Sequence, residues 1–427
     1  MQEEFLHYVW KFGLFNTKQL ATTDGQPLEI LGLGEHNHHS GPDFFNAKIK
    51  YDATTWAGNV EMHLQSSDWN KHKHSLDEAY NNVILHVVYV HDQEIRDANG
   101  RQLPTLELNG RISKQLLEKY LELQKNRAWI PCEKQVDTVG EFIRESWLSR
   151  LLVERLERKS GDIQQLLADT KNNWAETFYR ILARNFGFKI NADPFGWLAT
   201  SLPLSVLSKH KDNLFQLEAM LFGQAGLLDS GFVDGYPAEL QREYQLLRTK
   251  FKLVPLEAHV WKFMRLRPSN FPTVRIAQLA MLIHQSQGLF SKVTEAQSIR
   301  EIKDLFEVAT SRYWQTHYTF DKISNKRIKH LGENSVNTIL INTVVPFLFI
   351  YGRHKGNTRM EDRAIRFLDE LAGDKNTVIS KWEELGFPVH SAYYTQALLE
   401  LKSSYCNQKK CLNCGIGNQL LKEKSDR

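Results

Sequence analysis

Apolar and polar positions change their spacing at about residue 115 of this 427-residue chain. Before that point, a helical spacing of apolar residues over 4–15 is followed by short runs with strand-like alternation. The run at 82–90 is almost continuously apolar and β-branched, which predicts a strand buried on both faces. The pattern predicts a helix, three strands, a helix and a strand, at residues 4–15, 28–33, 43–51, 56–64, 76–80 and 82–90.

Helical periodicity dominates the rest of the chain. Its length favours more than one domain. We therefore expect an α+β N-terminal domain over residues 1–115, a mainly α-helical domain over 116–401, and a cysteine-bearing C-terminal tail over 402–427. The expected helices cover residues 112–127, 139–159, 174–186, 214–222, 237–251, 274–287, 299–308, 333–352, 359–371 and 391–401.

Two acidic residues stand on neighbouring expected strands. Asp43 opens the second strand and Glu61 lies inside the third. Two carboxylates can share a hard divalent cation, which suits metal-assisted hydrolysis of a phosphodiester. His63 lies on the same strand face as Glu61, because side chains alternate along a strand. We expect Asp43, Glu61 and His63 to be catalytic, with Mg²⁺ or Mn²⁺ held by the two acids. Turn chemistry at Asp43 and a solvent-facing Glu61 are the structural alternatives.

Histidines gather around these strands. Seven of the 16 histidines fall between residues 36 and 86. Imidazole suits transition metals, and it also contacts phosphate or carries protons. His72 and His74 are accessory candidates, and a solvated loop is the alternative for both. For His86, in the buried strand, we favour a core role. His36, His38 and His39 precede Asp43.

The four cysteines indicate a second metal site. Cys406, Cys411 and Cys414 have a C-x4-C-x2-C spacing, and the fourth cysteine is Cys132. If the tail folds back, four thiolates could enclose zinc or an iron–sulfur cluster, which the spacing does not distinguish. The alternative is a reduced surface tail.

The order of the N-terminal elements, with Pro42-Asp43 opening one strand and Glu61-Met62-His63 on the next, resembles the PD-(D/E)XK nuclease fold. The resemblance implies that Asp43 and Glu61 bind magnesium, with Glu4 as an additional acid. In that family a lysine two residues after the second acid assists the attacking water, and here His63 holds that position. Lys48 or Lys50 could substitute from the neighbouring strand.

That resemblance favours a DNA nuclease. The alternative is a catalytically inactive nuclease-like protein that binds nucleic acid or acts as a scaffold. A third interpretation is a histidine-ligated metallohydrolase acting on a small molecule. Some nucleases of this type also hold an iron–sulfur cluster through one distant cysteine and a late group of three, which is an analogy for the cysteines of this chain.

The whole chain is similar to a bacterial family known only as domain of unknown function 2851. The matching segments are GPDF at 41–44, GNVEMH at 58–63, SDWNKHKH at 67–74, NNVILHVV at 81–88 and the cysteine tail. This similarity implies no established activity.

Charge and hydropathy leave the partner open. The formal net charge of +4 permits nucleic-acid binding without demanding it. The first residues are acidic where a signal peptide is basic. The longest apolar run, 338–350, is shorter than the roughly 20 residues that span a bilayer and contains Asn and Pro, which predicts a buried helix. We expect a cytoplasmic protein without membrane contact.

Overall fold

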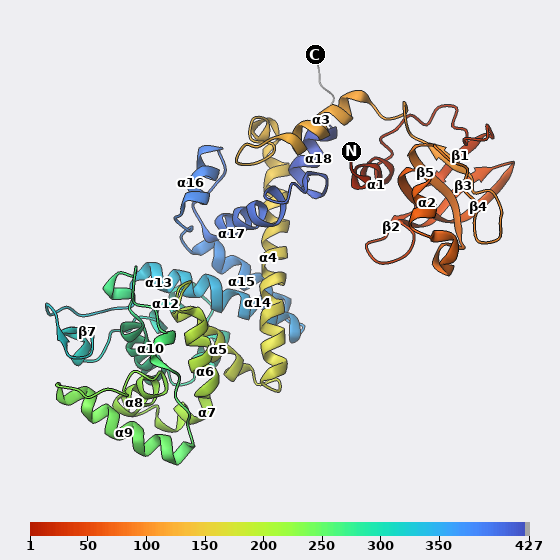
Figure 1. Ribbon diagram of the computed structural model, residues 1–427. Coiled ribbons are helices and arrows are strands. Elements are labelled where there is room, and N and C mark those ends of the chain that lie inside the picture. The colour runs from red at the N-terminus through yellow and green to blue at the C-terminus, as the bar shows by residue number, and fades with distance from the viewer. Residues whose placement is uncertain (423–427) are drawn as a thin grey trace. The chain divides into compact units, whose positions relative to one another are not determined.

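One mixed sheet organises the N-terminal part of the computed structural model, which describes residues 1–422 (Figure 1). Across the sheet the strands follow the order β1-β3-β4-β5-β6, and β2 pairs with β3. The pairs β1–β3 and β3–β4 are antiparallel, whereas β4–β5 and β5–β6 are parallel. The strands are β1 Leu28–Gly32, β2 Glu35–His36, β3 Phe44–Tyr51, β4 Thr54–Gln65, β5 Val83–Val90 and β6 Thr105–Glu107.

Helix α1, Glu3–Lys11, packs against this sheet. Its apolar side chains Phe5, Val9 and Trp10 are fully buried in one core with residues of β3, β4 and β5. Acidic residues begin the helix and Lys11 ends it, which complements the helix dipole. Strand β5 is buried along its first six residues, as its continuous apolar content predicted.

Three short helical turns connect β4 to β5 where the sequence predicted one helix at 76–80. They are α2 Asp68–Lys71, η1 His74–Leu76 and η2 Glu78–Tyr80. The buried Trp69 anchors the first of them. Because this segment crosses over to a parallel strand, its residues lie beside the ends of β4 and β5.

The end of the chain returns to the first unit. Leu116 and Tyr120 of α3, together with Leu412 and Leu421, belong to the same core as α1 and the sheet. The first compact unit is therefore Met1–Trp147 with the chain from Leu401 onward. The change from strands to helices near residue 115 is no boundary, because α3 completes the core of the sheet. The elements added are α3 Lys114–Lys125, η3 Val136–Thr138, the start of α4 Glu141–Asp169, η9 Leu401–Cys406, η10 Cys411–Asn413 and α18 Gly415–Lys422.

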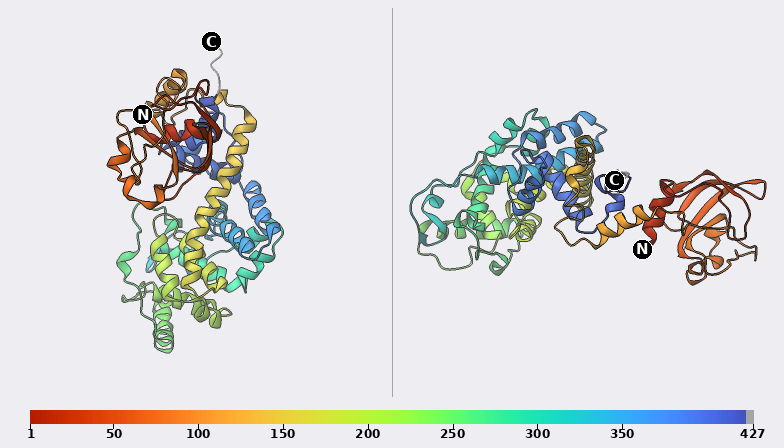
Figure 2. Two further views of the ribbon diagram at one scale, coloured as in Figure 1. Left: turned by 90° about the vertical axis from the view of Figure 1, so that its right-hand side faces the viewer. Right: turned by 90° about the horizontal axis from the view of Figure 1, so that it is seen from above.

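The second unit, Leu148–Glu400, is mainly helical, and its strands form one small hairpin (Figures 1 and 2). The α-helices that follow α4 are α5 Trp174–Phe186, α6 Ala192–Ser201, α7 Leu204–Leu207, α8 Leu214–Gln224, α9 Gly235–Phe251, α10 Pro272–Ser286, α11 Leu289–Glu295, α12 Ile299–Leu305, α13 Glu333–Ile339, α14 Val345–His354, α15 Thr358–Glu370, α16 Thr377–Glu384 and α17 Ala392–Glu400. The hairpin joins β7 His317–Thr319 to β8 Lys322–Ile323. The short 3₁₀ turns are η4 Ser208–His210, η5 Ala258–Val260, η6 Pro268–Asn270 and η7 Tyr313–Gln315, and η8 Leu340–Val344 is a π-helical segment.

The predicted helix at 333–352 is continuous but changes its winding. The π-helical segment Leu340–Val344 separates α13 from α14, just before Pro346. Proline lacks an N–H and disrupts the regular hydrogen-bond ladder, which accounts for the wider turn at this position. Within residues 1–422, Glu333–His354 is the one helix long and apolar enough to cross a membrane, and 78% of its most apolar window is buried inside the protein.

Gly58 lies where β4 and β5 pack too closely to leave room for a side chain. A Cβ atom at Gly58 would lie 2.5 Å from Ile84 Cγ2 and 2.6 Å from the backbone oxygen of Asn82. We expect Gly58→Ala to lower the free energy of unfolding of the first unit by about 1–3 kcal/mol, because the strands must separate. Urea unfolding followed by hydrogen exchange of β4 measures this change.

The matched control is Gly32→Ala in β1, where the nearest atom to a new Cβ is 3.8 Å away. This variant should be as stable as the natural protein. Equal stability of both variants would contradict the close packing at Gly58.

Candidate metal centre

The two predicted acids lie side by side at the junction of β3 and β4. Asp43 immediately precedes β3, and Glu61 lies inside β4. The backbone N–H of Asp43 donates to Glu61 Oε2 at 3.2 Å, and the N–H of Met62 donates to Asp43 Oδ2 at 2.9 Å. These reciprocal bonds hold both carboxylates at one point of the sheet. Glu61 is 5% exposed, so it is not a solvent-facing strand residue, and the Asp43 carboxylate accepts its hydrogen bond from the neighbouring strand.

Four imidazoles meet on the inner side of Glu61. His74 Nε2 lies 3.2 Å from Glu61 Oε1, and His63 Nε2 lies 3.7 Å from the same oxygen. His63 bridges two further rings: its Nε2 is 3.1 Å from His72 Nδ1, and its Nδ1 is 2.8 Å from His86 Nε2. Glu61 and His63 share a strand face, as the two-residue period predicted.

The turn after α2 brings His72 and His74 together. His72 ends α2, Lys73 takes a left-handed conformation with φ of 60°, and His74 begins the next turn. The chain reverses direction at Lys73, so the imidazoles of His72 and His74 both lie next to His63. Trp69 packs against His74, with ring centroids 5.3 Å apart, and Tyr80 stacks on His74 at 3.9 Å. These aromatic contacts fix the orientation of the His74 ring.

Helix α1 supplies two groups from one face. His7 Nε2 lies 3.3 Å from Asp43 Oδ2. Glu3, one turn earlier on the helix, interacts electrostatically with Asp43, and burial together with that charge raises the pKa of Glu3. Glu4 was predicted as the additional acid, but it is exposed and its electrostatic partner is Tyr120. Glu3 therefore occupies the place beside the acids that the sequence analysis gave to Glu4.

Burial sets the protonation of the centre. The pKa of Glu61 rises to about 9, first because the carboxyl is buried and then because Asp43 is close. The pKa of His63 falls to about 3, because burial and the neighbouring His86 both disfavour its charged form. His7 has a raised pKa, since its hydrogen bond to Asp43 and the charge of Asp43 outweigh burial. At neutral pH the centre holds a protonated Glu61 and a neutral His63.

His63, His72 and His74 can act as ligands to one metal ion. One ring nitrogen from each of the three lies within 4.8 Å of the others. Among the described residues, these three histidines are the group of potential ligands whose donor atoms converge this closely. Glu61 Oε1 extends the set, because it lies within 3.7 Å of two of these imidazoles. Three imidazoles and a carboxylate are a donor set typical of transition-metal sites.

The two lysines proposed as substitutes lie elsewhere on β3. Both are exposed. Lys48 pairs with Ala57, four residues before Glu61, which is roughly 13 Å along an extended strand. Lys50 pairs with Thr55, still farther from Glu61. The expectation that either lysine substitutes at His63 is therefore wrong, because the strand register carries both away from the acids.

The histidines before Asp43 form an outer layer. The ring of His36 lies 5.5 Å from that of His7 and 4.5 Å from that of His38, between ring centroids. Burial lowers the pKa of His36 to about 4. His38 and His39 are exposed. His36 thus extends the imidazole cluster towards the surface by way of His7.

Three residues of the centre escaped prediction as members of the site. His7 and Glu3 lie on a helix whose apolar spacing drew attention to its other face. His86 was expected to be a core residue, and it is fully buried, but it also contacts His63. The parallel pairing of β4 with β5 sets Glu61 opposite His86, a register that a single sequence does not reveal. The spacing of Glu3 and His7, four residues apart on one helix face, was the available signal.

All four cysteines belong to the first unit. They are free thiols. Cys411 is buried in the same core as α1 and the sheet, and Cys132 packs against that core. The tail therefore folds back towards Cys132, which is the condition for a site shared by all four cysteines.

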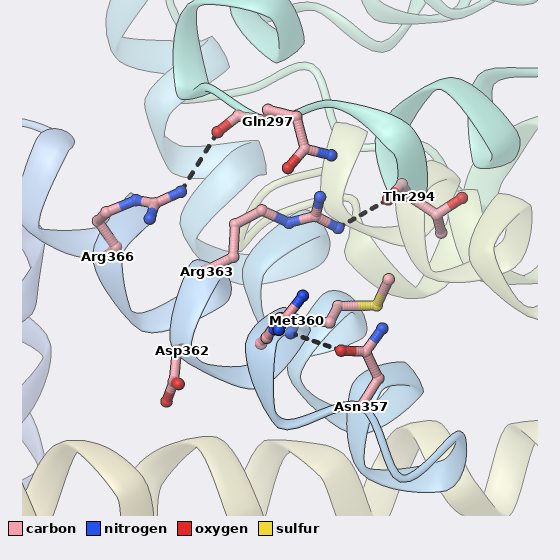
Figure 3. Close-up of a pocket in the computed structure, with 8 residues that line it drawn as sticks. Thr294, Gln297, Asn357, Met360, Asp362, Arg363 and Arg366 are labelled. Atoms are coloured by element: carbon pink, nitrogen blue, oxygen red, sulfur yellow. Dashed lines mark hydrogen bonds between the residues drawn. The ribbon is translucent and has the colours of Figure 1, made fainter.

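A separate concavity of about 560 Å³ lies in the second unit and is lined by three arginines (Figure 3). Two of them reach from α15 to backbone oxygens: Arg363 donates to Thr294 at 2.7 Å, and Arg366 donates to Gln297 at 3.3 Å. These bonds tie α15 to the last turn of α11 and to the segment that follows it. The visible role of the arginines is structural.

The raised pKa of Glu61 predicts a pH-dependent stability. Between pH 6.5 and 8 the folded protein keeps the Glu61 proton, whereas an unfolded glutamic acid has lost it. The folded state binds more protons, so this group makes the metal-free protein less stable as pH rises. Glu61→Gln should remove that contribution, giving a shallower slope in chelator-treated protein, measured by urea unfolding with hydrogen exchange of β4.

His7 and the cysteines also have raised pKa values, so they too make stability fall as pH rises, in the natural protein and in Glu61→Gln alike. The difference between the pH slopes of the two proteins therefore reports the contribution of Glu61. His63 and His86, with folded-state pKa values of about 3, are neutral in the folded protein over this range, and their partial protonation in the unfolded chain is the same in both proteins. Equal slopes would contradict a protonated Glu61.

Comparison with known proteins gives a family without a function. No curated protein and no solved structure matches the chain. A family model described as protein of unknown function (DUF2851) matches residues 3–377, which include Asp43, Glu61 and the imidazole cluster. Cys406, Cys411 and Cys414 lie beyond the matched residues. The chain therefore belongs to the DUF2851 family of proteins of unknown function.

Proposed function

We propose that this protein is a metal-dependent hydrolase that cleaves phosphodiester bonds, with DNA as the favoured substrate. One observation carries the proposal: the buried carboxylate of Glu61 lies against Asp43 on one side and two imidazoles on the other. A buried carboxylate is costly unless it is protonated or paired with positive charge. A divalent cation would neutralise both acids at this point.

The residues present fit such an ion. The Nε2 atoms of His7 and His74 are buried, and each lies within 3.3 Å of a carboxylate oxygen, that of Asp43 and that of Glu61 respectively. Buried ring nitrogens beside two carboxylates are potential metal ligands. Asp43 and Glu61 would hold the ion, with His63, His72 and His74 completing the set. When bound, the ion would supply a Lewis acid that polarises the phosphate and the attacking water.

The imidazoles favour Mn²⁺ over Mg²⁺. Magnesium prefers an all-oxygen shell and keeps several waters, whereas imidazole binds the later first-row metals more readily. Glu61 Oε1 lies close to two ring nitrogens, so an ion at this oxygen would meet nitrogen donors. We therefore expect activity with manganese to exceed activity with magnesium.

The protonation states distinguish the roles of two histidines. A pKa of about 3 makes His63 a weak base at neutral pH, so it suits a ligand or positioning role better than the proton transfer first expected of it. The pKa of His7 is raised and its side chain is 17% exposed, next to Asp43. His7 is better suited than His63 to exchange a proton at Nε2 near neutral pH.

The order of the elements supports the phosphodiester substrate. A helix, an antiparallel set of strands with acids at β3 and β4, and a parallel β5 follow the order on which the resemblance to PD-(D/E)XK nucleases was based. Exposed cations accompany the centre: Lys11 interacts electrostatically with His36, and Lys73 stands between two site histidines. Such cations suit contacts with a phosphate backbone.

The histidine group favours a second candidate, a transition-metal hydrolase acting on a small molecule. Its supporting observation is the 4.8 Å convergence of His63, His72 and His74, which does not by itself require a long substrate. This candidate predicts zinc, iron or manganese that remains bound through purification and is lost in His72→Ala, together with turnover of small phosphate esters but not of DNA.

Asp43→Asn is the direct test of the proposed function. Replacing a carboxylate ligand removes charge but keeps size, and we expect cleavage of labelled single- and double-stranded DNA to fall by about 100-fold or more. Cleavage is measured after chelation and readdition of Mn²⁺ or Mg²⁺. The control is Glu4→Gln, an exposed acid on α1, which should cleave as the natural protein does.

Equal cleavage by the natural protein and Asp43→Asn would overturn the proposal, as would absence of cleavage of any nucleic acid with any divalent metal. Equal DNA binding by both proteins without turnover would instead support a binding protein that has lost its chemistry.

His86 should act through His63. A metal on His63 Nε2 would fix the proton on Nδ1, and His86 Nε2, 2.8 Å away, would accept it. We expect His86→Phe to raise the Mn²⁺ concentration for half-maximal cleavage by about 10–100-fold, with activity restored at saturating metal. His86→Gln, which keeps an acceptor, should restore most of the affinity. The same loss in both variants would contradict an acceptor role.

A further inference from the structure

The four cysteines are brought together by two segments that lie far apart in the sequence. Cys132 follows α3, and the other three cysteines lie in the last turns of the chain, from η9 to the start of α18. Hydrogen bonds join the two segments: Gln124 Nε2 donates to the Lys409 oxygen at 3.0 Å, and Lys402 Nζ donates to the Trp129 oxygen at 2.5 Å. The two contacts flank Cys406 and lie shortly before Cys132, so they hold the two segments side by side.

Every pair of cysteines is close enough for their charges to interact. Cys132 interacts with Cys411 and Cys414, Cys406 interacts with all three others, and Cys411 interacts with Cys414. All six pairs are thus electrostatic neighbours, and all four side chains are free thiols. The fold brings all four cysteines of the chain into one region of the first unit, where every pair interacts electrostatically.

The loop around the last two cysteines has the geometry of a sulfur ligand turn. Cys411 and Cys414 are separated by two residues, and the backbone N–H groups of Ile416 and Gly417 donate to the Cys414 sulfur. N–H groups aimed at sulfur stabilise a thiolate. Gly417 permits this close turn, because a Cβ there would lie 2.2 Å from the Cys411 oxygen.

Without a metal, burying four neighbouring thiols contributes little to stability. Cys411 and Cys414 are each 7% exposed, and burial followed by the neighbouring thiols raises the pKa of Cys132 and of Cys411 to about 12. Four like charges would repel one another in an apolar setting, whereas a bound cation reverses that repulsion and deprotonates its thiol ligands.

We propose that Cys132, Cys406, Cys411 and Cys414 bind one thiophilic metal centre, a zinc ion or an iron–sulfur cluster. Four thiolates complete the coordination of either centre. The centre fastens the C-terminal segment to the end of α3, so it closes the first unit. It lies outside the residues of the proposed hydrolytic site, and it does not depend on the proposed function.

Metal analysis of the full chain tests this site. The protein is purified under anaerobic conditions in the Glu61→Gln and His72→Ala background, which removes ligands of the other centre. We expect about one zinc per chain, or iron with a matching amount of acid-labile sulfide and visible absorption. Cys132→Ser should lower the metal content to background. Ser404→Ala, which leaves every cysteine in place, is the control and should keep the metal.

A cysteine variant that fails to fold would leave metal content ambiguous, so a second measurement uses the unaltered chain. Its four thiols should be protected from a thiol reagent in the native state and become reactive after metal removal with a chelator. Added Zn²⁺, or iron with sulfide, should restore the protection. A folded chain without zinc or iron, whose thiols react equally before and after metal addition, would overturn the proposal.

Discussion

The buried carboxylate of Glu61 is the constraint on which the arrangement of the first unit depends. A carboxyl group inside a sheet needs partners, and the fold supplies them to Glu61 from Asp43 before β3, His63 on β4 and His74 after α2. His7 on α1 contacts Asp43 in turn. The turn at Lys73, the stacking of Tyr80 and the packing of α1 all serve to place these groups. The rest of the sheet is a conventional apolar core around one polar point.

This point combines features of two chemistries. The reciprocal bonds between Asp43 and Glu61 hold two carboxylates that could serve a hard cation, while the imidazoles beyond Glu61 would favour a softer one. The neutral state of His63 reconciles them, because a neutral ring offers a lone pair where a lysine would offer only charge. Under the proposed function, histidine in place of lysine at this position would change the metal that the site favours rather than simply weaken the site.

Local sequence patterns predicted the helices and strands well, but they did not predict which strands and helices pair with one another. The bounds of α5 agree with the periodicity at 174–186, and β5 agrees to within one residue, because apolar spacing is a local signal. Asp43, Glu61 and His63 were predicted from their strand positions. His86 and His7 were not assigned to the site, since their roles follow from the parallel register of β4 with β5 and from the face that α1 turns to the sheet. The boundary near 115 was misplaced because α3 belongs to the core that precedes it.

The return of the chain end to the first unit has a consequence for synthesis. Leu412, Leu421 and three of the cysteines are needed to complete a core whose other parts are made at the beginning. Residues 148–400 must all be translated in between. At ordinary elongation rates of about 5–20 residues per second, the core of the first unit waits for tens of seconds without its C-terminal part. The helical unit is fully synthesised first, so it can complete its fold before the first unit does.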